Sequence, residues 1–189
     1  MKKLLLVCLL LAGSVSSLFA VDYYWVGGAG NWTDINHWAT TTGGTTKHSI
    51  VPSQNDNVFF DANSGLANND IVTLPANGDA YCKNMSWVGV TTTASFRRGG
   101  GGFSINIYGN LELANSVAYG MQSINFLGTE NATVRCNGAV RVNATGWYNP
   151  MSINKTGASV TFLDGIPEFL QVNILQAASG TLVLSGSTH

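Results

Sequence analysis

Three tryptophans near the N-terminus have the chemistry best suited to ligand binding. Each indole of Trp25, Trp32 and Trp38 offers a flat apolar face and an N–H donor, and this combination suits stacking on a sugar ring. We therefore take these three as candidate ligand-binding residues, with glycans as the candidate ligands. The competing interpretation, which we favour, is structural. In it the indoles plug the open end of a repetitive fold, and the glycines among them allow tight turns.

The acidic and histidine residues form no recognisable catalytic or metal-binding pattern. His37 and His48 are eleven positions apart, with no H-E-x-x-H pattern, so we predict no zinc site. Four aspartates match no calcium-loop pattern, and turn or strand-end roles are expected for them. No carboxylates are visibly paired as in a glycosidase, although coil stacking could pair distant ones. We expect no catalytic residue, no metal and no cofactor; the aspartates are Asp56, Asp61, Asp70 and Asp79.

Two cysteines, Cys82 and Cys136, remain after the first 20 residues. In an exported protein they could form one disulfide that closes a long loop. They could equally be small buried apolar residues, because Cys136 occupies an apolar slot of an alternating stretch. We favour burial, since coils of about 20 residues would place the two cysteines too far apart for a bridge.

The elements that must position these residues are short β-strands in a repeat. A tag of the form apolar-x-apolar-x-small recurs roughly every 20 residues, as expected for coils of a β-solenoid. We predict an all-β parallel β-helix (β-solenoid), with a β-sandwich as the alternative. The expected strands cover 58–60, 70–74, 81–88, 103–108, 111–113, 123–127, 133–136, 139–142, 151–154, 159–163 and 181–184. The tags start at Met85, Ile105, Ile124, Val140, Val160 and Leu182.

The chain divides into three parts. Residues 1–20 have the charged, apolar and small-residue order of a secretory signal peptide, and their apolar run is too short to span a membrane. Residues 21–62 are rich in aromatics and form the expected N-terminal cap. Residues 63–189 are the expected coils. No polar cap follows the last tag, so we expect the chain to be truncated at its C-terminus.

The composition of the chain limits the kinds of molecule that it could bind. Removing Lys2 and Lys3 leaves seven basic against ten acidic residues, so no basic stripe exists for nucleic acid. The mature chain contains no second apolar run that could span a membrane, and 45% apolar content disfavours disorder. Secretion or display at the cell surface is the expected localisation.

The segment from Tyr23 to Trp38, YYWVGGAGNWTDINHW, resembles the start of large secreted surface proteins of Bacteroidota-type bacteria. The segment 51–61 and later stretches are similar to the same proteins. The resemblance implies a parallel β-helix-like passenger, commonly followed by adhesive repeats and a sorting domain for type IX secretion. It implies no catalytic residues.

The leading functional prediction is a non-enzymatic, adhesin-like surface segment whose partners are glycans or other surface proteins. The alternatives are a polysaccharide-active β-helix enzyme and a carbohydrate-binding module that uses the N-terminal tryptophans. For a stacked fold we expect Asp at Ile107 or Phe126 to prevent folding. Ser at Asn106 or Asn125 is expected to be tolerated.

Overall fold

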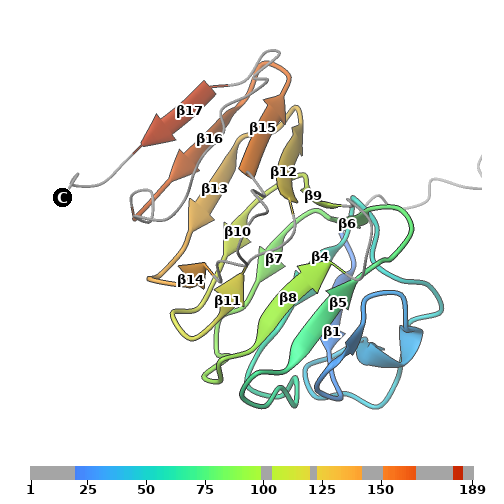
Figure 1. Cartoon of the computed structure of the whole chain (residues 1–189). Coiled ribbons are helices and arrows are strands. Elements are labelled where there is room, and N and C mark those ends of the chain that lie inside the picture. The colour runs from blue at the N-terminus through green and yellow to red at the C-terminus, as the bar shows by residue number, and fades with distance from the viewer. Residues whose placement is uncertain (1–19, 99–103, 120–122, 142–150, 165–180, 185–189) are drawn as a thin grey trace, which may run out of the picture.

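The protein is built from short β-strands wound into a solenoid, in a computed structural model that describes residues 20–98, 104–119, 123–141, 151–164 and 181–184 (Figure 1). Within these ranges the one helical element is a single 3-10 turn, η1 (Ile35–His37). The predicted signal peptide, apart from Ala20, and the last five residues lie outside the described residues. The predicted β-solenoid is confirmed, and the β-sandwich alternative is wrong.

Three sheets run along the solenoid, here called A, B and C. All pairings are parallel except that of β1 with β3. Sheet B consists of β2 (Gly30–Asn31), β5 (Ile71–Leu74), β8 (Ser95–Arg98), β11 (Ala118–Tyr119) and β14 (Val140–Arg141). Sheet C consists of β6 (Ala80–Cys82), β9 (Ser104–Ile107), β12 (Ser123–Gly128) and β15 (Met151–Lys155). Sheet A consists of β3 (Trp38–Ala39), β1 (Asp22–Trp25), β4 (Asn57–Phe59), β7 (Met85–Ser86), β10 (Leu111–Glu112), β13 (Ala132–Arg135), β16 (Ser159–Phe162) and β17 (Thr181–Leu184).

Each full coil visits the sheets in the order A, B, C. The sets β4–β5–β6, β7–β8–β9, β10–β11–β12 and β13–β14–β15 repeat this order, and the strands stack from blue to red along one axis (Figure 1). Coil length varies: Ile124 pairs with Ile105, 19 residues earlier, whereas Phe162 pairs with Val134, 28 residues earlier. Neighbouring coils therefore share register but not length.

The sequence tags mark strands but not equivalent points of successive coils. Met85 lies in sheet A, Ile105 and Ile124 lie in sheet C, and Val140 lies in sheet B. The expected period of about 20 residues was therefore wrong as a coil length. The physical reason is that all three strands of a coil alternate between inside and outside in the same way, so the tag cannot distinguish them.

The core consists of apolar columns that follow the stacking axis. In sheet C, Cys82, Ile107, Phe126 and Ile153 stack in register, and each is at most 2% exposed. Burying one such aliphatic or aromatic side chain contributes about 1.5–3 kcal/mol. A charge at Ile107 or Phe126 would lie inside this column without a partner, which is why the sequence-based expectation of misfolding there stands.

An aromatic column connects the first coil to those that follow. The ring of Trp25 is 5.5 Å from that of Phe60, and Phe60 is stacked on Trp87 at 3.9 Å. Trp87 in turn is stacked on Phe96 at 5.4 Å. The Trp87 indole N–H has no hydrogen-bond partner among the described residues, so its role here is apolar packing.

The N-terminal segment 21–62 is continuous with the coils rather than separate from them. Strands β1 and β4 are neighbouring parallel strands of sheet A, and β2 begins sheet B. The non-repeating part lies between β2 and β4, where β3 runs antiparallel to β1 and a further bridge joins Ala39 to Lys47. This reversal covers the free edge of β1, which would otherwise expose unpaired backbone groups.

The contacts of His37 account for several residue types in the aromatic N-terminal motif. Its ring is stacked on Trp25 at 4.5 Å, and its Nδ1 donates to the Val26 carbonyl at 2.6 Å. Asp34 accepts a hydrogen bond from the Asn36 N–H and so begins the turn that carries His37. Gly30 is required because a Cβ at this position would overlap the His37 imidazole. The motif therefore builds the cap.

Polar ladders bind successive coils together on the outside. At the corner before sheet A, Asn57 donates to Asp22 at 2.8 Å, and Asn84 donates to Asn57 at 2.8 Å. The Asn84 side-chain oxygen then accepts the Asn110 N–H at 2.7 Å. Each amide thus satisfies a group of the neighbouring coil, which stabilises the register.

A second ladder runs along sheet C. Asn106 donates to Asp79 at 2.9 Å and accepts from Asn125 at 2.8 Å. Asn106 is only 4% exposed, so we expect serine there to lower stability, in contrast to the expectation from sequence. Sequence alternation assigned Asn106 correctly to the outward side of its strand. It could not reveal that the ladder buries this amide.

We predict that Gly30→Ala destabilises the cap by about 1–3 kcal/mol, because the methyl group forces the His37 ring away from Trp25. Thermal unfolding measures the effect. Ala29→Ser, at an exposed neighbouring position, is the matched control and should unfold like the unmodified protein. Equal melting temperatures for the two variants would contradict this packing.

We predict that Asn106→Ser lowers the free energy of unfolding by about 1–3 kcal/mol, because serine cannot span both ladder partners and leaves them unpaired. Asn125→Ser removes one of these bonds at a less buried position. It should lower the free energy of unfolding by clearly less than Asn106→Ser does. Urea titration of both variants gives the comparison. A larger loss for Asn125→Ser would rule out the central role of Asn106.

Candidate functional site

The three tryptophans proposed from sequence as ligand-binding residues are buried in the cap. Trp25 and Trp38 are 0% exposed and Trp32 is 2% exposed. The Trp38 Nε1 donates to the Trp32 carbonyl and the Trp25 Nε1 donates to the Gly28 carbonyl, both at 2.7 Å. The rings therefore leave no face for a sugar, and this placement corrects their assignment as binding residues. The indoles instead pack against one another.

The two cysteines are free and buried, so the possible disulfide is absent. Cys82 stands in the inner column of sheet C, and Cys136 directly follows β13 of sheet A. They are separated by more than two coils, or roughly 10 Å along the axis, which exceeds the Cα separation that a disulfide allows. Burial raises the pKa of the Cys82 thiol, and burial together with Asp164 raises that of Cys136 to about 12. Neither thiol is suited to nucleophilic chemistry.

The four aspartates considered for calcium have turn and strand-end roles. Asp70 accepts the Ala67 N–H at 2.8 Å, and Asp79 accepts the Ser104 N–H at 2.7 Å. Asp56 and Asp61 similarly accept backbone N–H groups within their own turns. Among the described residues no three His, Cys, Asp or Glu side chains form a group that could hold a metal ion.

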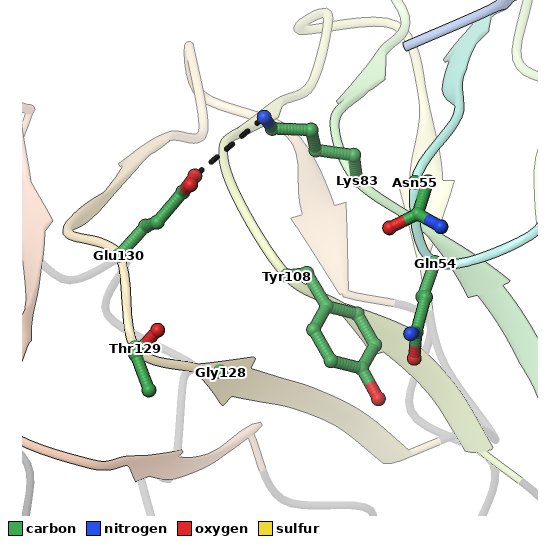
Figure 2. A pocket seen from close by; sticks show the side chains of 7 residues that line it. All are labelled: Gln54, Asn55, Lys83, Tyr108, Gly128, Thr129 and Glu130. Atoms are coloured by element: carbon green, nitrogen blue, oxygen red, sulfur yellow. Dashed lines mark ion pairs between the residues drawn. The ribbon is translucent and has the colours of Figure 1, made fainter. Parts of the chain in front are cut away.

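A pocket of about 290 Å³ lies at the corner where the chain passes from sheet C to sheet A (Figure 2). Four successive coils contribute to it. Gln54 and Asn55 precede β4, Lys83 lies between β6 and β7, and Tyr108 lies between β9 and β10. The remaining lining residues follow the same corner one coil later: Gly128, Thr129 and Glu130.

The pocket combines one aromatic ring, two amides, a hydroxyl and an ion pair. Figure 2 shows the Tyr108 ring in the middle, with the Gln54 side chain beside it and the Lys83–Glu130 pair on the opposite side of the opening. The Lys83 Nζ lies 3.6 Å from the Glu130 carboxylate. Burial of Tyr108 raises the pKa of its phenol, with a smaller contribution from Tyr81, so the hydroxyl remains a neutral donor.

Gly128 keeps the Tyr108 ring accessible. A Cβ at Gly128 would lie 3.1 Å from the Tyr108 Cδ1, so any side chain here would press on the ring. Gly128 also has a φ of +93°, a conformation that other residues rarely adopt. The end of β12 thus suits a glycine for two independent reasons.

Lys155 holds the backbone beneath the pocket. Its side chain is 0% exposed, and its Nζ donates to the Tyr108 carbonyl at 2.7 Å and to the Leu127 carbonyl at 2.8 Å. Burial lowers the pKa of Lys155, while the charge of Glu130 partly offsets this. One ammonium therefore ties together two corners whose residues line the pocket, which makes Lys155 a positioning residue.

A second hollow, of about 380 Å³, lies at the sheet A to sheet B corner. Two of its polar side chains are already engaged, since Asn137 donates to the Leu113 carbonyl at 2.8 Å and Glu112 lies 3.7 Å from Arg135. It has no aromatic lining residue, so we regard the Tyr108 pocket as the better candidate binding site.

Sequence analysis did not identify the Tyr108 pocket. The four segments that line it are 20 or more positions apart, and none belongs to a motif with a chemical meaning. The available signal was the small residue that ends each tag, because Gly109 and Gly128 both mark this corner.

No helix within the described ranges is both long and apolar enough to cross a membrane. Comparison with protein-family models, with curated proteins and with solved structures gave no match.

We predict that the two buried thiols make the protein less stable in alkali. Their folded-state pKa values are raised, so their stabilising effect is complete below the unfolded value of 9.0 and is lost as the pH rises toward the folded values. Each thiol should make the free energy of unfolding about 1.4 kcal/mol lower at pH 10 than at pH 8. Urea titrations at both values, with a Cys82→Ala/Cys136→Ala variant, measure the difference. The variant should lose less stability; parallel losses would refute the prediction.

Proposed function

We propose that this chain is an exported, non-enzymatic β-solenoid that serves as an adhesin-like surface segment. The observation that carries the proposal is the continuous set of polar ladders and apolar columns from the cap through the coils. These side chains are committed to stacking one coil on the next. Such a scaffold provides a stiff, extended surface, which is the property a presenting segment needs.

The chemistry of the Tyr108 pocket supports binding rather than turnover. A glycosidase of the common kind needs two carboxyl groups on opposite sides of the bond to be broken. The pocket has one lining carboxylate, Glu130, and Lys83 faces it at 3.6 Å. The second carboxyl group that such an enzyme needs is therefore missing from the lining of this pocket.

The proposal of export rests on the first 20 residues. The proposal of surface display rests on the resemblance of the N-terminal motif to secreted surface proteins. The packing of His37 against Trp25 and Gly30 in this motif supports a capping role. A cap is what the first coil of a long stack requires.

The proposal predicts an exported protein that binds saccharides or surface proteins without converting them. The full chain is expressed in a bacterial host, and the processed protein is applied to glycan arrays and a polysaccharide panel with reducing-sugar detection. A charge in the apolar run of the leader, Leu9→Arg, should keep the chain inside the cell. Release of reducing sugars, or retention of the unmodified chain in the cytoplasm, would contradict the proposal.

A further inference from the structure

We propose that the corner pocket around Tyr108 binds one neutral pyranose ring of a glycan, with the Tyr108 ring as the stacking surface. This inference rests on the proposed function and assigns a ligand class to a specific site. The candidate sugar-binding group is now the Tyr108 ring, which lines an open pocket, and no longer the buried N-terminal indoles (Figure 2).

The stacking surface comes from Tyr108 and the residue facing it. Tyr108 is partly exposed, and glycine at position 128 leaves the ring uncovered. A pyranose has an apolar C–H face, and aromatic rings offer a large, rigid contact area for such a face. The Lys155 bond to the Tyr108 carbonyl holds the backbone of this residue in place before any ligand arrives.

Three polar side chains around the ring form no hydrogen bond within the described residues. No hydrogen bond engages the side chains of Gln54, Asn55 or Thr129 within the described part of the chain, whereas the ladder amides are all committed. Side-chain amides and hydroxyls both donate and accept, which matches the hydroxyl groups of a sugar. Polar groups that converge on a partly apolar pocket are characteristic of ligand sites.

The charge balance favours a neutral sugar over an acidic one. The two charged lining residues, Lys83 and Glu130, face each other and cancel. The ammonium of Lys155 is turned to backbone carbonyls, and the carboxylate of Asp56 is turned to Ser53. No lining cation is therefore left over for a uronate.

The test is protein-detected NMR titration of the exported, full-length processed protein with methyl glycosides of glucose, galactose, mannose and N-acetylglucosamine. Methyl glucuronide is the acidic comparison. A shallow pocket for one ring should give a dissociation constant on the order of 1 mM. We expect at least one neutral glycoside to shift Tyr108, Gly128 and Thr129 signals, and glucuronide to bind more weakly.

Two variants locate the site. Tyr108→Ala should weaken binding at least about tenfold, the loss of one stacked ring. The double variant Gln54→Ala/Asn55→Ala changes only exposed side chains, so it should fold normally and still weaken binding severalfold. Tyr24→Ala is the aromatic control, because Tyr24 is stacked on Phe59 outside the pocket. It should bind like the unmodified protein.

The inference fails if no neutral glycoside binds, if glucuronide binds more tightly, or if the double variant binds normally. These results are separate from those that test the proposed function. Unchanged glycoside binding by Tyr108→Ala would overturn the sugar site and leave the surface role standing. Conversion of a polysaccharide would overturn the non-enzymatic role and leave the measured sugar binding unaffected.

Discussion

Parallel stacking of coils in register is the constraint on which the rest of this structure depends. Because each backbone group pairs with the coil above or below, equivalent positions of successive coils lie one strand spacing apart, at about 4.8 Å. An inward residue therefore always faces another inward residue, as in the column from Cys82 to Ile153. Outward residues align as well, which turns single asparagines such as Asn57 and Asn84 into ladders. Coil length can vary because corners absorb the extra residues.

The same constraint explains the N-terminal cap. A stack of parallel strands ends in an unpaired edge and an open apolar interior, and both are costly in water. This chain covers the edge of β1 with the reversed strand β3 and fills the interior with Trp32 and Trp38. The cap is also attached to the coils through the Phe60–Trp87 stack. The tryptophans thus stabilise the first coil, and binding chemistry has to be sought on other residues.

Corners are where such a fold can vary without losing its core. Strand residues are committed to columns and ladders. Some corner residues, such as Trp87 and Leu113, are also buried in the core, but others point outward and meet their counterparts from neighbouring coils. The Tyr108 pocket arises in this way, from four coils that each contribute one short segment. Lys155 links two of these corners by donating to the Tyr108 and Leu127 carbonyls. A rigid scaffold that carries a variable polar site at a corner is consistent with a surface-binding protein.

Much of the fold could be predicted from alternation within single strands. It identified strands such as β9, β12 and β16, because the period of two is a local property. It missed β8 and β11, where alternation is weak, and it misjudged coil length, because all three strands of a coil carry the same pattern. By itself the sequence determined that the chain is a β-solenoid with an aromatic start. Only the tertiary structure decided which strands share a sheet, that Trp25, Trp32 and Trp38 are buried, and that Tyr108 meets Gln54 and Gly128. These depend on pairing between strands that are separated in the sequence, such as Trp25 with Trp38 or Ile105 with Ile124, and no local pattern encodes such pairing.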